Sequence, residues 1–445
     1  MNSIKAMLFF LLPICLNGQI LTVQQCIDRA LANNSELAAD VTQYEKRLSQ
    51  VKEASSQLLP QADLSLSYQR QSTVPELEFP QGTLPGGMPL SGLFPKGGFE
   101  LGSPDQIDAR LKISQPLFTG FRLRRQKEAR KEHVNVSKQN MEQNKRDLIF
   151  RVYKTYGQVL QARNLVDIAE TSRNQIQSHL QDVQHLLQQG MARKDQVLRV
   201  KVKLSEAELT ILKAQNGLKL SKAALEQTIG ESLDHSLHFT EWQLAIDVDS
   251  LAVAIDRALK NRSEIQALNR MHAATRIQTQ IAKGGRWPSV SAFGILGYGK
   301  PGLDFIENEW MDYWIVGIGS QWKVWDWGKT NAQIEYAQLE SRRLEYQLEA
   351  VRDAIRLDVE QAWFNWQETA ERIQLTLEIE EQARLSFEIV NNSFNQGMAT
   401  QSEVLDAQSE LTRARTLVVQ TRIEHSVAAA NLARAMEMNI ETHKK

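Results

Sequence analysis

The sequence lacks any internal apolar run long enough to form a membrane-spanning helix, which needs about 20 such residues. Its charges nearly cancel, with 52 lysines and arginines against 53 aspartates and glutamates. This balance disfavours a nucleic-acid-binding protein, which usually has a basic excess. The sequence also lacks a phosphate-binding glycine loop, a helical metal-type histidine pair and a nucleophile motif. We therefore expect no enzyme, no cofactor and no metal site, and interpret His235 and His238 as surface residues.

Cysteine is scarce, and its position is informative. Lys5 precedes an apolar run at residues 6–16, followed by Asn17 and Gly18. This pattern predicts a signal peptide at residues 1–18 and therefore an exported protein. Cys15 lies within that segment, where the bulky Ile14 before it disfavours lipid attachment. Because only Cys26 would remain in the mature chain, no internal disulfide is expected.

Proline and glycine are nearly absent from two long stretches. Residues 121–188 contain no proline and one glycine, and residues 329–396 contain neither. Apolar residues recur there in steps of three and four, which predicts helices with a coiled-coil seam, each about 100 Å long. Shorter helices are expected at 21–59, 192–229, 250–285 and 400–438. We expect the helix at 192–229 to stack end to end on the helix at 250–285, and the helix at 21–59 on the helix at 400–438. Each stacked pair would match the length of one long helix. A solvated coiled coil is the simpler alternative.

Two pairs of similar segments indicate that the chain contains an internal duplication. QGMARKDQVL at 189–198 resembles QGMATQSEVL at 396–405, and CIDRALANNSEL at 26–37 resembles AIDRALKNRSEI at 254–265. We expect a first repeat at 19–230, an equatorial connector at 231–249 and a second repeat at 250–445. In the first repeat, residues 69–106 contain six prolines and seven glycines, which predicts a long exposed loop.

Alternating segments flank this loop and its shorter counterpart in the second repeat. Leu64, Leu66 and Tyr68 alternate with polar residues, as do Leu111 and Ile113 in the next segment. A period of two predicts strands, and runs of about 10–13 residues match tilted strands that cross a bilayer. Five tryptophans could form an interfacial belt: Trp310, Trp314, Trp322, Trp325 and Trp327. Trp322 is expected within the last strand.

Four strands per chain cannot close a barrel around water, since small barrels need about eight. Open sheet edges are not tolerated in lipid, so several copies of the chain would have to share one barrel. The alternative is a soluble sheet with one wet face. At the other end of the chain, Gly190 and Gly397 lie where each long helix must reverse, and Thr400 with Glu403 has capping-box spacing. Each repeat would therefore send a helical hairpin to the same end of the molecule.

Taken together, these features resemble the outer membrane efflux protein family, the TolC-like channels. The resemblance rests on LTVQQCIDRALANNSEL at 21–37, QPLFTG at 115–120, the two hairpin turns and the duplication. It implies a mixed α+β membrane protein in the bacterial outer membrane, with four strands and long coiled-coil helices per chain. It also implies a homotrimer with a twelve-stranded barrel and a periplasmic helical tunnel. A periplasmic adaptor would bind the tunnel end and connect it indirectly to an inner-membrane transporter.

The resemblance assigns roles to individual residues. The family's acidic selectivity ring falls on Glu403 and Asp406, whose mutual repulsion across three chains would raise some pKa values. The aromatic gate position holds Phe394, which lacks a hydroxyl. Glu403 could equally serve only as a helix cap. The adaptor-docking tips fall on Gln189, Gly190, Met191 and Ala192 in the first hairpin, and on Gln396, Gly397, Met398 and Ala399 in the second.

The sequence therefore predicts a passive exit duct of a tripartite efflux pump for small molecules such as drugs, toxic compounds or metal ions. One alternative keeps the channel but has it secrete proteins or peptides. A second alternative is a coiled-coil tether of the cell envelope that conducts nothing.

Overall fold

The structure is a computed structural model that describes residues 20–77, 86, 99–100, 102–233, 238–242, 244, 246, 248–304 and 309–438. The predicted signal peptide, His235 and most of the predicted long loop lie outside these residues. The described chain divides into two compact units. One draws on Met1–Gln43, Ser137–Ala267 and Gln347–Lys445, and the other on Tyr44–Val136 and Leu268–Tyr346. We call them the hairpin unit and the sheet unit.

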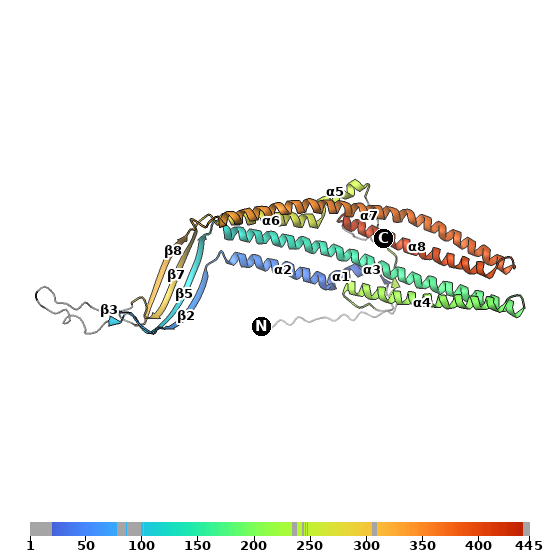
Figure 1. Cartoon of the computed structure of the whole chain (residues 1–445), viewed down its shortest axis with the longest axis horizontal. Helices are drawn as coiled ribbons and strands as arrows, with labels where there is room; N and C mark the ends of the chain where they lie inside the picture. The colour runs from blue at the N-terminus through green and yellow to red at the C-terminus, as the bar shows by residue number, and fades with distance from the viewer. Residues whose placement is uncertain are drawn as a thin grey trace, which may run out of the picture. The chain divides into compact units, whose positions relative to one another are not determined.

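The sheet unit contains one antiparallel sheet of four strands in the order β2-β5-β7-β8 (Figure 1). The strands are β2 (Gln61–Arg70), β5 (Asp105–Phe118), β7 (Ser289–Lys300) and β8 (Met311–Gln321). A separate short pair joins β3 (Glu76–Leu77) to β4 (Phe99–Glu100). All four predicted strands are confirmed. The expected place of Trp322 was wrong, because β8 ends at Gln321 and Trp322 follows the strand.

The register of this sheet gathers apolar side chains on one face. One row across the four strands consists of Leu64, Leu111, Leu296 and Trp314. Leu64 is 69% exposed and Trp314 is 72% exposed. The opposite face carries polar contacts, including a 2.6 Å ion pair from Arg110 to Asp108. The sheet therefore has one polar face and one apolar face that its own chain leaves largely uncovered.

Helices continue from the strands of the sheet unit. α2 (Ser35–Ser56) leads into β2, and α6 (Ser263–Gly284) leads into β7. α3 (Arg122–Gln188) follows β5, and α7 (Lys329–Asn395) follows β8. The two predicted long helices are thus confirmed to within one residue at each end. Each described helix is either too short or too polar to cross a membrane.

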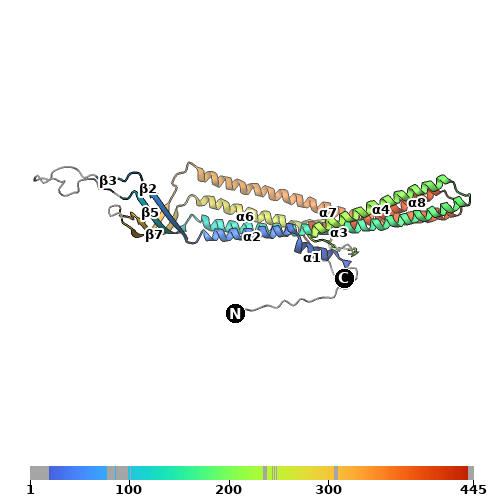
Figure 2. The ribbon, with the colours of Figure 1, turned by 90° about the horizontal axis from the view of Figure 1, so that it is seen from below.

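The hairpin unit contains two antiparallel helical hairpins (Figure 1). α4 (Lys194–Ile229) runs back along α3, and α8 (Gln401–Ala435) runs back along α7. The same unit holds α1 (Val23–Asn33), α5 (Leu251–Asn261) and a parallel pairing of β1 (Ile20–Leu21) with β6 (His238–Phe239). Figure 2 shows the α3–α4 and α7–α8 hairpins from another side.

One apolar core of the hairpin unit surrounds two tyrosines of α3. Tyr153 and Tyr156 are fully buried against Trp242 and Phe239. The Tyr156 hydroxyl lies 2.7 Å from the Leu21 carbonyl oxygen and accepts a 2.9 Å hydrogen bond from the Thr240 amide. A single buried hydroxyl therefore ties β1 and the segment after β6 to the long helix.

Two predicted helices were wrong in one respect, because each is broken in the structure. Residues 21–59 are interrupted at Asn34, and residues 250–285 at Arg262. Asn34 adopts an extended conformation, and its side-chain oxygen accepts hydrogen bonds from the amides of Glu36 and Leu37. It therefore acts as the N-cap of α2 and ends α1.

His238, which the sequence predicted to be a surface residue, is exposed on β6.

The predicted end-to-end pairing of the short helices was also wrong. The end of α4 meets the break between α1 and α2, where the side-chain amide of Asn34 donates a 3.0 Å hydrogen bond to the Thr228 carbonyl oxygen. The end of α8 meets the break between α5 and α6, where the Ser263 amide donates a 2.7 Å hydrogen bond to the Glu437 carboxylate. The returning helix of each hairpin thus meets a helix from its own half of the sequence.

Candidate functional site

The two hairpin turns have the same backbone geometry. Gly190 and Gly397 both adopt a left-handed φ of 72°. Met191 donates a 2.8 Å hydrogen bond to the Leu186 carbonyl oxygen, and Met398 makes the equivalent bond to Ser393. A Cβ atom at either glycine would meet no other atom within 4 Å. Glycine is therefore needed for its backbone conformation, which satisfies carbonyl groups at the helix end.

The tip residues are mostly exposed, and the two tips touch through their returning helices. Met191 is 68% exposed and Met398 is 72% exposed. The side-chain amide of Gln401 donates a 2.8 Å hydrogen bond to the backbone carbonyl oxygen of Gln196. Val404 beside this contact is buried. Each tip therefore presents one large apolar side chain while the first turns of α4 and α8 are fixed to each other.

Glu403 lies in the first turn of α8 and serves as part of a capping box. Its carboxylate accepts hydrogen bonds from the Thr400 amide at 2.6 Å and the Thr400 hydroxyl at 3.0 Å. These bonds lower the pKa of Glu403 in the single chain. Asp406, one helical turn further on, is exposed on α8. The raised pKa expected from three chains stays a prediction.

Phe394 does not stand free at the tip in this chain. It packs on His179 of α3 with ring centroids 4.9 Å apart in an edge-to-face arrangement. It also contacts an apolar cluster of α3 and α4 that includes Val183 and Val200. Phe394 therefore links the two hairpins within one chain.

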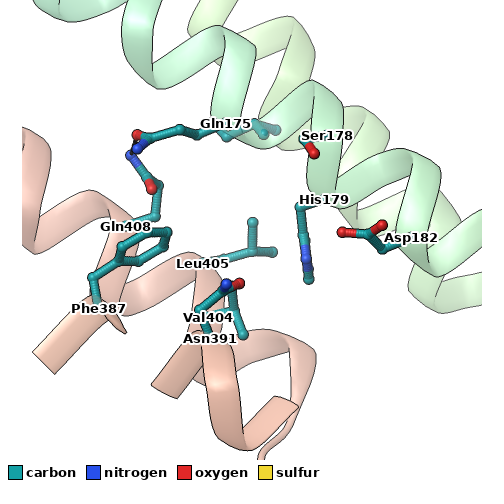
Figure 3. Close-up of a pocket in the computed structure, with 10 residues that line it drawn as sticks. Gln175, Ser178, His179, Asp182, Phe387, Asn391, Val404, Leu405 and Gln408 are labelled. Carbon is teal, nitrogen blue, oxygen red and sulfur yellow. Dashed lines mark hydrogen bonds between the residues drawn. The ribbon is translucent and has the colours of Figure 1, made fainter. Parts of the chain in front are cut away.

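A cavity of about 210 Å³ lies beside this contact, between α3 on one side and α7 and α8 on the other (Figure 3). The Gln408 amide of α8 closes one side with a 2.7 Å hydrogen bond to Gln175 of α3. His179 is 6% exposed, and its Nε2 atom has no hydrogen-bond partner among the described residues. Burial lowers the pKa of His179, against the opposing effect of Asp182. Sequence reasoning missed this cavity because its walls come from segments about 200 residues apart.

The aromatic residues singled out in the sequence lie near the ends of the sheet strands. Trp310 stacks on Tyr298 near one end of β7 and β8, with ring centroids 5.1 Å apart. At the other end, Trp325 and Trp327 form an edge-to-face pair, and the Trp322 indole donates to the Arg286 carbonyl oxygen. Trp314 lies within β8 on the apolar face. Trp287, 62% exposed just before β7, belongs with this group and was not predicted.

Residues 26–231 and 254–436 match the sequence profile of the family described as outer membrane efflux protein. The chain belongs to the outer membrane efflux protein family. Outer membrane efflux protein BepC of Brucella suis biovar 1 (strain 1330) is 21% identical over 326 residues, 73% of this chain and 70% of BepC. Toxin and drug export protein A of Aggregatibacter actinomycetemcomitans is 22% identical over 322 residues, 70% of this chain and 68% of the relative.

Solved structures of outer-membrane channels share the fold of this family member. The outer-membrane channel OprN superposes with a TM-score of 0.76 at 18% identity, covering 94% of this chain and 90% of OprN. The open state of the Neisseria gonorrhoeae MtrE outer membrane channel gives a TM-score of 0.75 at 18% identity, with the same coverage of both chains. VceC of Vibrio cholerae gives 0.74 at 16% identity, covering 94% of this chain and 97% of VceC.

Membership of the outer membrane efflux protein family fixes the general class of the protein. It is a non-enzymatic, TolC-like transport protein of the outer membrane that extends into the periplasm. Within the described residues, no group of three or more histidine, cysteine, aspartate or glutamate side chains could hold a metal ion.

Proposed function

We propose that three copies of this chain form the passive exit duct of a tripartite efflux pump, which carries small molecules across the periplasm and outer membrane. In this proposal the four strands of each copy contribute to one twelve-stranded barrel, and the helices form the tunnel. The observation that carries the proposal is the four-stranded sheet with one apolar face and two unpaired edges.

The edges of this sheet need partners. β2 and β8 each pair on one side only within the described residues. Unpaired strand edges are not stable in lipid, where water cannot satisfy their backbone groups. Because all three pairings in the sheet are antiparallel, β2 and β8 run in opposite directions. The β8 edge of one copy can therefore pair with the β2 edge of the next, and repetition of this step closes a ring.

The height of the sheet also fits a membrane. β8 has 11 residues, which extend about 36 Å along the strand. Tilted as strands in membrane barrels are, it spans about 27 Å, close to the usual apolar band of about 25 Å. Exposed aromatic residues lie near both ends of β8, as the headgroup regions favour.

The helices carry apolar seams that one chain leaves uncovered. On α4 the exposed residues fall on a single helix face, since they follow in steps of three, four, seven and eight: Leu198, Val202, Leu209, Leu212 and Leu220. On α7 a second seam includes Leu357, Phe364, Leu375 and Ile389. When one surface of a copy contacts a different surface of the next copy, repetition of the contact closes into a ring if the rotation between copies permits it. These seams therefore support contacts between neighbouring copies.

We also propose that the chain is a duplicated unit, with repeats at 19–230 and 250–445 joined by the connector at 231–249 and preceded by a signal peptide at 1–18. Matching helices support this. α1 and α5 both have 11 residues, α2 and α6 both have 22, and α3 and α7 both have 67. The three-copy ring would then have approximate sixfold symmetry in its helical part.

The hairpin tips are the proposed docking site for a periplasmic adaptor protein, which connects the duct to an inner-membrane transporter. The exposed Met191 and Met398 support this, because methionine adapts to irregular apolar surfaces. Glu403 and Asp406 are proposed to face the pore at its narrow end and Phe394 to act in the gate.

Since the relative from Aggregatibacter is named for toxin and drug export, protein or peptide secretion is the second candidate. A non-conducting tether is the third.

Single-channel recording in planar bilayers tests the proposal. The purified protein is compared with the double variant Glu403→Ala/Asp406→Ala, and with Glu208→Ala as a control that removes an exposed acid from α4. We expect stable, cation-preferring currents that lose their preference only in the double variant. A well-folded oligomer that conducts neither alone nor with its adaptor would favour the tether instead. Unchanged selectivity in the double variant would limit the two acids to helix capping.

A further inference from the structure

Two of the four helix ends that meet the sheet are strongly basic. The first ten residues of α3, Arg122–Lys131, contain six basic residues and one acidic residue. Residues 276–287, at the end of α6, contain three basic residues and no acidic one. This excess contrasts with the whole chain, whose net charge is −1. The positive charge is therefore concentrated at one level of the sheet unit.

Direct contacts hold these basic segments together. The backbone at Gly120 lies against Gly284, where a Cβ atom would come within 2.3 Å of a carbonyl oxygen. The Arg125 guanidinium donates a 3.0 Å hydrogen bond to the Gln280 carbonyl oxygen. The Arg286 guanidinium donates at 2.8 Å to the side-chain oxygen of Asn331 at the start of α7. The start of α3, the end of α6 and the start of α7 thus form one continuous surface.

The basic side chains of this surface are not neutralised by their own chain. Within the described residues, no ion pair involves the side chains that we name the basic collar: Arg122, Arg124, Arg125, Lys127, Lys283 and Arg286. Their protein partners, where present, are uncharged: carbonyl or amide oxygens, and the Phe121 ring, which lies 5.7 Å from the Arg125 guanidinium. By contrast, arginines further along α7, such as Arg343 and Arg384, are paired with carboxylates. The collar keeps its charge available for an external anion.

A groove extends from the collar between α6 and α7. Its walls include Arg276, Lys283 and Arg342, the hydroxyls of Thr279 and Ser341, and one carboxylate, Glu345, which lies 3.2 Å from the His272 ring. Within the described residues, neither Arg276 nor Arg342 forms an ion pair. Three cations against one carboxylate leave the groove with an excess of positive charge, which suits a phosphate group.

The collar lies beside the exposed tryptophans of the strand ends. Arg286 and Trp287 are adjacent in sequence, and the Trp322 indole donates to the Arg286 carbonyl oxygen at 3.1 Å. Tryptophan favours the boundary between acyl chains and headgroups. The collar, on the helical side of these tryptophans, would then lie at the level of the lipid phosphates.

We propose that the basic collar binds the headgroups of anionic phospholipids in the leaflet that faces the helices. This inference rests on the proposed barrel and names a lipid class for it. The collar would fix the depth of the barrel in the membrane. Each basic residue near an anionic surface contributes roughly fivefold to binding, so three together contribute about a hundredfold.

The test measures binding of fluorescent phosphatidylglycerol to the full-length protein in detergent, with fluorescent phosphatidylcholine as the zwitterionic reference. The collar variant is Arg124→Gln/Lys127→Gln/Lys283→Gln, which replaces three members of the collar. The matched control, Lys138→Gln/Lys145→Gln/Lys154→Gln, removes three exposed lysines from α3 further from the sheet. We expect the unmodified protein to prefer phosphatidylglycerol, the collar variant to bind it about a hundredfold more weakly, and the control to bind it unchanged.

Three results would overturn the proposal. The first is equal binding of the two lipids by the unmodified protein, which needs no variant. The second is an equal effect of the collar and control substitutions. The third is displacement of phosphatidylglycerol by inorganic phosphate at a concentration equal to that of the lipid, which would make the collar a general anion site. Channel currents of the same samples separate this failure from failure of the proposed channel, since the collar variant should still conduct.

Discussion

At the scale of single residues, the two turn glycines have the clearest physical role. Both adopt a left-handed φ, and neither is packed against another residue that would exclude a Cβ atom. An alanine there would be strained by about 1 kcal/mol, since residues with a Cβ disfavour this conformation. The glycine at the same position of both turns is therefore explained by backbone conformation. This part of the candidate site could be predicted from the sequence.

We predict that Gly190→Ala and Gly397→Ala each lower the free energy of unfolding by about 1 kcal/mol. Gly217→Ala is the control, because Gly217 lies within α4 with open space around it. There alanine should stabilise the helix by up to about 1 kcal/mol. Thermal unfolding in detergent measures all three. Stabilisation at the turns would show that their glycines are not under conformational constraint.

The buried His179 makes the packing of the two hairpins depend on pH. Its folded-state pKa is lowered, so the unfolded or separated state binds a proton more readily. The stability that it contributes is present above its ordinary pKa of about 6.5 and is lost as the pH falls through the lowered value. Among the residues lining its cavity, Asp182 is the one that carries a charge, because α7 and α8 contribute uncharged side chains.

We predict that His179→Gln removes part of this pH dependence. The protection factors of the α3 and α8 amides near the cavity, which are exchange rates corrected for the pH dependence of intrinsic exchange, should fall from pH 8 to pH 5 in the unmodified protein and fall less in the variant. His133→Gln, in the sheet unit, is the control, because the pKa of His133 is also lowered by burial. Identical exchange profiles for the unmodified protein and His179→Gln would refute a role for this histidine.

At the scale of helices and strands, local patterns predicted much of the fold. The long helices and all four strands were recognisable, because the spacing of apolar residues reports which face is covered. The breaks at Asn34 and Arg262 were missed. Asparagine is a preferred N-cap residue, so the break at Asn34 had a local signal. Arginine cannot cap a helix with its side chain, and the break at Arg262 is completed by the distant Glu437. The pairing of helix ends and the cavity beside His179 could not be predicted, because they depend on contacts between distant segments.

The ends of α4 and α8 contact the starts of α2 and α6 in similar positions, but different residues cap those two helix starts. Gly230 after α4 and Glu437 after α8 are 207 residues apart, and both adopt positive φ, of 73° and 55°. Beside Gly230, Asn34 caps α2 with its own side chain. Beside Glu437 the matching position holds Arg262, which cannot accept a hydrogen bond. Glu437 replaces that cap, bonds the Ser263 amide and pairs with Arg146.

We predict that Glu437→Ala lowers the free energy of unfolding by about 3 kcal/mol, because it leaves Arg146 and the Ser263 amide without their partner. Glu437→Gly should be about 1 kcal/mol less damaging, since glycine accepts the positive φ. Thermal unfolding of the two variants measures the difference. If the alanine variant were the more stable one, backbone strain at Glu437 would have no part in the energetics.

At the scale of the whole molecule, the apolar seams determine whether copies associate. We predict that Leu209→Gln/Leu212→Gln weakens the trimer, because each leucine loses about 2 kcal/mol of apolar burial in each interface. Glu208→Gln/Lys213→Gln is the control, with adjacent positions and the same new residue. Molar mass in detergent at decreasing protein concentration measures this. Equal dissociation of the two variants would place the interface elsewhere.

The central claim is that β8 of one copy pairs with β2 of the next until three copies close a ring. Cysteine cross-linking tests it most directly, with Ser65→Cys in β2 and Ile315→Cys in β8 joined by a flexible bifunctional reagent. The native Cys26 is buried, and burial raises its pKa to about 12, so it should react little. The account predicts a ladder that ends at three linked chains for the double variant, and no ladder for either single variant. Linked dimers from Ile315→Cys alone, or a ladder beyond three chains, would contradict it.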